Sequence, residues 1–242
     1  MELFKATLWI YKSACLKTVQ LLQKNWGLIL APLAYSLVLS VAALLLWPFW
    51  LIGGVILWIV TAACASSGLY LIENVIRMGK ATINDFKKGF TVYLGEILTI
   101  GFILWIPMML LSRVAYATQE GALLVLAIKI LVYVILNALP ELIYQSRLSG
   151  LALLSGSYQF IVENWVEWLL PNLLIAAAGY LLAGLVSNLT YWMPYFVQFF
   201  VLSAAFGLFL TFLMLFRGVL FAELNGTTRR SRLYRYKANA SK

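Results

Sequence analysis

The residues that could do chemistry in this sequence form one polar row on an otherwise apolar stretch. They are Lys129, Tyr133, Asn137, Glu141 and Tyr144. At about 100° per residue, a helix places all five inside an arc of about 120°. Polar side chains within a membrane helix face the bundle interior or another protein. The row is therefore the candidate for a transport pathway or a proton relay.

The expected depth of Lys129 in the membrane restricts what it can bind. Glu96 and Glu141 are expected near the cytoplasmic ends of their helices, so neither carboxylate is level with Lys129. The neighbouring span would offer the carbonyl of Ile103, freed by a proline one turn further on, and the ring of Trp105. We expect these groups to hold Lys129, or its ammonium to snorkel outward. A transport or proton-relay role is the alternative.

Other chemistry is excluded by the residue types that the sequence lacks. It has no His, a single Asp (Asp85) and two Cys (Cys15 and Cys64), which excludes His-based metal sites, Ser-His-Asp and Cys-His relays and paired aspartates within this chain. An intramembrane enzyme would depend on Glu96, Glu141 and tyrosines, with both carboxyl groups near the water boundary. We therefore expect no catalytic residue, no cofactor, no metal site and no enzymatic activity.

The elements that position these residues follow from the composition. Of 242 residues, 63% are apolar and 11% are charged, and the mean hydropathy is +0.91. A soluble domain is about 45–50% apolar and about 25% charged, so the composition is that of a membrane protein. We predict an all-α, polytopic membrane helical bundle over residues 1–226, followed by a basic cytoplasmic tail over 227–242. Since one crossing takes about 20 residues, six transmembrane helices are expected at about 26–47, 51–76, 93–112, 121–144, 165–187 and 195–222.

Two of the uncharged runs resemble each other as if one hairpin occurred twice. An Asn-Trp pair lies at the start of the first run and just before the second, and each run contains an aromatic turn around a proline, the first at Trp47-Pro48-Phe49-Trp50. At one constant offset, Gln20 falls on Gln159, Asn25-Trp26 on Asn164-Trp165, Leu30 on Leu169 and Pro32 on Pro171. This agreement between uncommon residue types indicates a parallel internal repeat.

The basic residues orient the bundle and mark its contact with lipid. The charged residues of segment 2–24, with Ser13, Gln20 and Gln23, fall within an arc of about 140°, which predicts a basic amphipathic helix along the inner leaflet. The tail is expected to be a disordered tether to the same leaflet. Both termini should be cytoplasmic in the inner (cell) membrane, because Lys and Arg gather in the inner loops and at the ends. The residues expected to contact anionic inner-leaflet lipids are Lys5, Lys12, Lys17, Lys24, Arg229, Arg230 and Arg232.

Three further features have a simpler interpretation. The tail could also bind RNA or an acidic partner protein, but no folded module surrounds it, so we expect no nucleic-acid partner. Pro32, and Pro171 with Asn172, are candidates for a midplane substrate site, although they are expected close to the inner surface. Small residues predict close packing of helices within the chain at 53–54, 62–68, 176–179 and 183–184.

The overall plan resembles a loose group of uncharacterised bacterial multi-pass membrane proteins. It consists of a basic amphipathic helix, an Asn-Trp pair at Asn25, a hairpin of spans, a basic link from Arg77 to Lys88 and a second Asn-Trp pair at Asn164. The plan is also similar to the membrane portion attached to some glycerophosphodiester phosphodiesterases. The phosphodiesterase domain, with its His and acidic residues, has no counterpart in this sequence, so no catalytic residue carries over. The resemblance implies only an inner-membrane helical bundle.

Two functions remain open. The first is a non-catalytic integral membrane subunit that scaffolds or stabilises a larger membrane protein assembly, favoured by the lack of a nucleotide-binding loop and by apolar faces rich in Phe, Trp and Tyr. The alternative is a permease, or the membrane component of an exporter, for a lipid-like or small apolar solute. It requires a cavity that reaches the polar row between Lys129 and Glu141. The expected partners are anionic lipids and other membrane protein subunits.

Overall fold

Helices and short turns make up the whole of the chain that the computed structural model describes, residues 2–117 and 120–240. No strand occurs in this part, which confirms the expected all-α class for these residues. In chain order the elements are α1 (Glu2–Lys24), η1 (Trp26–Leu30), α2 (Ala31–Leu46), η2 (Trp47–Phe49), α3 (Trp50–Met78), α4 (Ile83–Val92), α5 (Leu94–Ala117), α6 (Gly121–Ile135), α7 (Leu139–Gln145), α8 (Leu151–Thr190), α9 (Tyr195–Leu224) and α10 (Arg229–Ala240).

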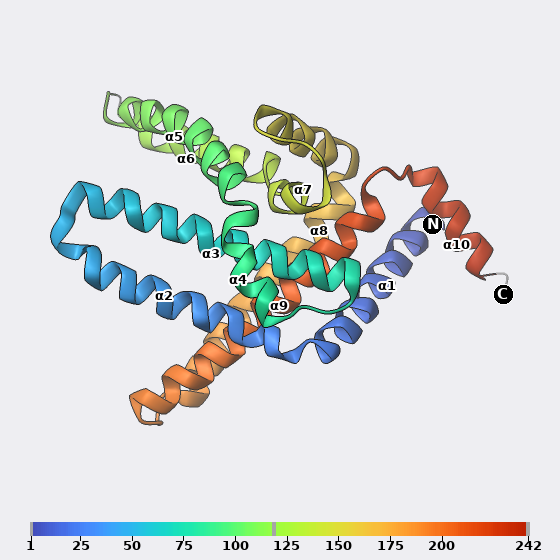
Figure 1. Cartoon of the computed structure of the whole chain (residues 1–242). Helices are drawn as coiled ribbons and strands as arrows, with labels where there is room; N and C mark the ends of the chain where they lie inside the picture. The colour runs from blue at the N-terminus through green and yellow to red at the C-terminus, as the bar shows by residue number, and fades with distance from the viewer. Residues whose placement is uncertain (1, 118–119, 241–242) are drawn as a thin grey trace.

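Several segments are long and apolar enough to cross a membrane. Within the described residues there are five: Trp26–Met78, Ile83–Arg113, Gly121–Gln145, Leu151–Thr190 and Phe196–Leu224. The first of them has 53 residues and contains two helices, α2 and α3, which pack side by side and run in opposite directions (Figure 1). The fold is therefore that of a helical, multi-pass membrane protein.

Three helical hairpins spread apart from a common base (Figure 1). We call them the first arm (α2 and α3), the second arm (α5 and α6) and the third arm (α9 and the part of α8 that packs against it). The base consists of the helix ends away from the hairpin turns, together with α1, α4, α7 and α10 (Figure 1). The largest fully buried side chains lie mostly here, and they include Trp168, Phe221, Leu153, Leu220 and Leu224. The arms therefore converge at the base, and the first and second arms also touch part-way along, where the rings of Trp58 on α3 and Phe102 on α5 pack edge to face.

The turn of the first arm lies where the sequence predicts it. Pro48 is part of η2, and Trp50 has a φ of 42°, an uncommon positive value for a residue with a side chain. Gly53 follows within the first turn of α3, where a Cβ would lie 2.4 Å from the carbonyl oxygen of Leu46. The chain closes this turn because residue 53 has no side chain.

Helix α4 forms where the sequence analysis expects only a basic link. Its first turn is a capping box, in which the Asp85 amide donates to Thr82 Oγ1 at 3.3 Å and the Thr82 amide donates to Asp85 Oδ2 at 2.8 Å. Gly89 of α4 meets α3 so closely that a Cβ would lie 2.8 Å from Ser67 Cα. The predicted small-residue run at 62–68 therefore packs against α4.

The predicted span at 121–144 is broken into two helices. Helix α6 ends at Ile135 and α7 begins at Leu139, with a turn between them. Pro140 lies in the first turn of α7, where its missing N–H leaves no helix bond unmade. Because the chain turns here, residues on either side of the break do not share one helix face.

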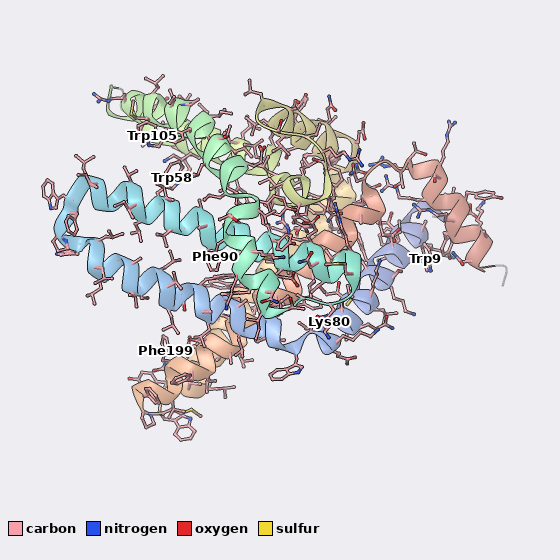
Figure 2. All side chains as sticks on the ribbon, viewed as in Figure 1. Trp9, Trp58, Lys80, Phe90, Trp105 and Phe199 are labelled. Carbon is pink, nitrogen blue, oxygen red and sulfur yellow. The ribbon has the colours of Figure 1, made fainter. Side chains whose placement is uncertain are left out.

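The tail is a helix packed against α1, which corrects the expectation of a disordered tether. Lys237 Nζ lies 2.7 Å from Glu2 Oε2, and Arg235 Nη1 lies 3.3 Å from Glu223 Oε2. Trp9 of α1 lies beside α10 (Figure 2). These two pairs join the tail to carboxylates on neighbouring helices and favour the folded helix over a free chain.

Candidate functional site

The most buried ion pair in the described part of the chain joins α7 to α9. Arg217 Nε donates to Glu141 Oε1 at 2.7 Å, and Nη2 donates to Oε2 at 2.9 Å. The two side chains are only 15% and 4% exposed. Arg217 Nη2 also donates to the carbonyl oxygen of Asn137. A bidentate pair of this kind fixes the relative position and orientation of the two side chains. Each charge also neutralises the other, since either one alone would be costly to bury.

The indole of Trp168, on α8, completes this group. The side chain is fully buried, and its Nε1–H donates to Asn137 Oδ1 at 2.9 Å. The Arg217 guanidinium lies 5.1 Å from the centre of the indole ring, a cation–π contact. We call Asn137, Glu141, Trp168 and Arg217 the Glu141–Arg217 centre. It joins three helices of the base at one point.

The structure brings only part of the predicted polar row together. Glu141 and Tyr144 are buried and Asn137 is half-buried, whereas Lys129 and Tyr133 on α6 are exposed. Lys129 and Tyr133 therefore do not point into the interior of this chain together with Glu141 and Tyr144, because they lie on α6, before the break that precedes α7. No carboxylate of the described residues forms an ion pair with Lys129.

A second polar cluster ties α3 to the start of α5 and to α7. Glu73 pairs with Arg77, one turn further along α3, at 2.9 Å. It also accepts a hydrogen bond from the hydroxyl of Tyr93. Arg77 Nη2 donates to the carbonyl oxygen of Tyr144 at 3.1 Å. Both polar clusters thus lie at the base, where they fix the ends of the arms.

Arg217 and Glu73 were not among the predicted site residues, although each provides the charge at the centre of one of these clusters. Arg217 lies inside the predicted span 195–222, and Glu73 inside 51–76. A charge within a predicted span is the signal that identifies such residues. The partner is harder to predict, because Glu141 is 76 positions away from Arg217 in the chain.

A cavity of about 490 Å³ opens beside the Glu141–Arg217 centre, between α6, α8 and α9. Its polar lining comes from Tyr133, Asn137, Asn172 and Arg217. The other lining side chains are apolar, except for the indole N–H of Trp165. Asn172 Nδ2 donates to the carbonyl oxygen of Trp168, while Asn172 Oδ1 is buried without a hydrogen-bond partner. The cavity reaches the part of the polar row that the permease hypothesis requires.

The residues considered for a midplane substrate site lie apart. Pro32 lines an apolar cavity of about 530 Å³ that also touches α3, α7 and α9. Asn172 lines the cavity beside the Glu141–Arg217 centre, and Pro171 is buried within α8. Pro32 and Asn172 therefore line different cavities in the described part of the chain.

The basic residues expected at the lipid surface divide into three groups. Arg230 and the four lysines of α1 (Lys5, Lys12, Lys17 and Lys24) are exposed. Arg229 forms a two-point pair with Glu167, at 2.8 and 3.0 Å. Arg232 is not at the surface as expected: the residue is 4% exposed and its Nη2 donates to Asn164 Oδ1 at 2.8 Å. It lies inside because α10 folds back against α1 instead of extending along the membrane.

Neither a metal site nor a similarity to a known protein identifies the function of this site. Within residues 2–117 and 120–240, no group of three His, Cys, Asp or Glu side chains could hold a metal ion. No family model, curated protein or solved structure matches this chain. The resemblance to bacterial multi-pass proteins therefore stays a prediction.

Proposed function

We propose that this chain is a non-catalytic integral membrane subunit that scaffolds a larger membrane protein assembly. The observation that carries the proposal is the divergence of the three arms (Figure 1). In the most apolar part of each candidate span, only 6% to 22% of the residues are buried within the chain. Apolar helices held apart in this way leave room between them for helices of other subunits.

Exposed small residues on the arms support partner helices in these gaps. At Gly54 and Gly184, no atom of a neighbouring element lies within 4 Å of where a Cβ would stand. Gly179, also on α8, is different, since a Cβ there would lie 2.5 Å from Phe209. Small residues are where membrane helices approach one another closely. Gly179 serves packing inside the third arm, whereas Gly184 is open to a second molecule.

The fixed base supports a scaffold rather than a moving carrier. Glu141 and Arg217 join α7 to α9, and Glu167 and Arg229 join α8 to α10. Glu73 links α3 to the start of α5 through the hydroxyl of a tyrosine. Each arm is thus anchored at its base by a charged or hydrogen-bonded contact, so the angles between the arms are constrained.

The proposed placement is an inner-membrane one with six crossings and both termini on the cytoplasmic side. The contact between Glu2 and Lys237 supports an even number of crossings, because α1 and α10 lie together. The count of six treats α2 and α3 of segment Trp26–Met78 as separate crossings. The abundance of Lys and Arg on the base favours the cytoplasmic side for it. Reporter fusions that put the two termini in different compartments would contradict this placement.

We further propose that the first and third arms are copies of one duplicated hairpin. After each hairpin the chain passes through a glycine with positive φ, 76° at Gly79 and 69° at Gly226. A threonine then accepts a hydrogen bond at the start of a short helix: Thr82 before α4 and Thr228 before α10. The same order of elements after both hairpins supports the repeat.

The scaffold proposal is tested by purification in mild detergent with a pair of matched variants. Gly184→Leu fills the open surface of α8, so copurifying membrane subunits should be lost while thermal unfolding of the chain itself is unchanged. Leu189→Phe, at an exposed position on another face of α8, is the control and should retain them. A strictly monomeric wild-type particle without partners would contradict the proposal.

A permease or exporter component is the second candidate, favoured by the cavity that Asn137, Asn172 and Arg217 line. Its polar atoms lie among apolar walls, which suits a lipid-like solute with a polar group. Asn137→Ala in proteoliposomes should then reduce the flux of a fluorescent lipid-like solute without loss of bound subunits. Wild-type flux equal to that of protein-free vesicles would exclude this candidate.

A further inference from the structure

Arg232 is a buried cation whose hydrogen-bonding capacity is only partly used. Its Nη2 donates to Asn164 Oδ1 at 2.8 Å and to the carbonyl oxygen of Thr227 at 3.3 Å. Its Nε and Nη1 are buried and have no hydrogen-bond partner. A guanidinium carries N–H donors on all three nitrogens. Two of the three nitrogens of Arg232 therefore lack an acceptor.

No carboxylate within the described residues neutralises this charge. Glu167 is nearby, but both of its oxygens already accept hydrogen bonds from Arg229. Burial lowers the pKa of Arg232, Glu167 opposes this, and the positive charges of Arg229 and Arg235 add to the lowering. A buried charge without a partner is costly, and an anion from outside the chain would remove that cost.

The same arginine lines a cavity of about 530 Å³ between α1, α8 and α10. The charged lining is Glu167, Arg229 and Arg232. Leu170 and Leu174 lie about one and two turns beyond Glu167 on α8, so the wall becomes apolar along the helix. Across the cavity, α1 contributes Phe4, Leu8 and Ile10. The cavity is thus charged at one end and apolar along its length.

We propose that this cavity binds an anionic amphiphile, with the guanidinium of Arg232 donating to its phosphate or carboxylate oxygens. The hydrocarbon chain lies against Leu170 and Leu174 of α8 and Leu8 of α1. These side chains are partly exposed, so the apolar wall is open to the surrounding lipid. The cavity volume is within the range of about 300–1,000 Å³ that is typical of ligand sites.

The site is distinct from general attraction of lipid headgroups to the exposed lysines. Surface lysines contribute to any anionic membrane contact, with no fixed geometry. Arg232 instead offers a fixed pair of donors beside a shaped apolar wall. The site does not depend on the scaffold role, since its residues lie on α1, α8 and α10 at the base.

The test measures ligand-induced thermal stabilisation of the full-length chain in an uncharged detergent. Phosphatidylglycerol should raise the unfolding temperature, and phosphatidylcholine or inorganic phosphate should not. Arg232→Gln should weaken the apparent affinity for phosphatidylglycerol about tenfold or more, as expected for loss of charge-assisted hydrogen bonds. Arg230→Gln makes the same change of net charge at an exposed position of α10 and should leave the affinity unchanged.

Equal weakening by Arg232→Gln and Arg230→Gln would overturn the proposal, because surface charge alone would then explain binding. Inorganic phosphate as effective as phosphatidylglycerol would also overturn it, in favour of a simple anion site. Leu170→Trp provides a second measurement if Arg232→Gln does not fold. The larger side chain narrows the cavity without changing a charge and should weaken phosphatidylglycerol binding. Unchanged affinity in this variant would contradict the proposal that the cavity is the binding site.

Discussion

Asn25 and Asn164 hold the same non-helical backbone conformation at the starts of the first and third arms. Their φ and ψ angles are −126° and 41° at Asn25, and −125° and 20° at Asn164. Each side-chain amide donates to the carbonyl oxygen four residues earlier, that of Leu21 at 2.9 Å and that of Phe160 at 3.2 Å. The side chain thereby caps a carbonyl at the point where the helix is interrupted.

Replacement of Asn25 by alanine should destabilise the fold. Asn25 Nδ2 also donates to the Gly79 carbonyl at 2.9 Å, and its Oδ1 accepts from the Ala81 amide at 3.1 Å. Each group left unpaired and buried costs about 1–3 kcal/mol. Asn239→Ala, on the exposed surface of α10, is the control and should change the free energy of unfolding by less than about 0.5 kcal/mol. Equal denaturant curves for the two variants would show that the link to Gly79 and Ala81 contributes nothing.

Breaking the Glu141–Arg217 pair should cost more than breaking an exposed pair. Glu141→Gln leaves a buried guanidinium without its carboxylate, and we expect a loss of about 3–5 kcal/mol. Glu223→Gln, in the half-exposed pair with Arg235, should cost about 0–1 kcal/mol.

A double variant separates the two parts of that cost. Glu141→Leu with Arg217→Met removes both charges and should recover much of the stability, because no charge stays buried alone. Chemical denaturation in detergent measures all three variants. A double variant less stable than Glu141→Gln would show that the pair stabilises the fold beyond mutual neutralisation.

Much of the helical framework is predictable from the sequence because the membrane imposes it. The helix predicted at 2–24 is found as α1, and the turn predicted at 47–50 is found at η2. Helix α4 was predictable but missed, since the Thr82 and Asp85 spacing of its capping box is visible in the sequence. Apolar runs and local caps are short-range patterns, and a single sequence is enough to locate them.

The candidate site depends on contacts between distant residues, which a single sequence does not specify. Glu141 belonged to the predicted polar row, but its partner Arg217 did not. Lys129 was predicted to be the cation of the row, whereas Arg217 is the one that pairs with Glu141. The break between α6 and α7 also removed the single face on which the row depended. Arg232 was expected at the exposed surface because nothing local predicts that α10 folds back onto α1.

Alanine at Gly53 and at Gly54 should have opposite consequences. A Cβ at position 53 would lie 2.4 Å from the Leu46 carbonyl oxygen, so Gly53→Ala must open the turn of the first arm. At position 54 nothing lies within 4 Å, and alanine favours a helix over glycine by about 1 kcal/mol. We expect Gly53→Ala to lower the unfolding temperature and Gly54→Ala to hold or raise it. The same shift in both variants would mean that the turn tolerates a side chain.

The phenol of Tyr11 should make stability depend on pH in the alkaline range. Its hydroxyl donates to the Glu167 carbonyl oxygen at 3.0 Å. Burial, followed by the negative charge of Glu167, raises the pKa of Tyr11 from 10.0 to about 12. A raised pKa means that folding favours the neutral phenol. This contribution is complete below the unfolded pKa and is lost as the pH rises through the folded pKa.

Tyr11→Phe should remove that dependence. Below about pH 10, the variant should differ from wild type by a constant amount, of the size of one hydrogen bond, about 0.5–1.5 kcal/mol. Between about pH 10 and about pH 12, wild type should lose stability relative to Tyr11→Phe, because the wild-type phenol ionises more readily in the unfolded chain. All other ionisable groups are present in both proteins, so their contributions cancel in the difference. Tyr234→Phe, at an exposed position of α10, controls for the loss of a hydroxyl. A difference that stays constant across the whole range would refute the buried, hydrogen-bonded phenol.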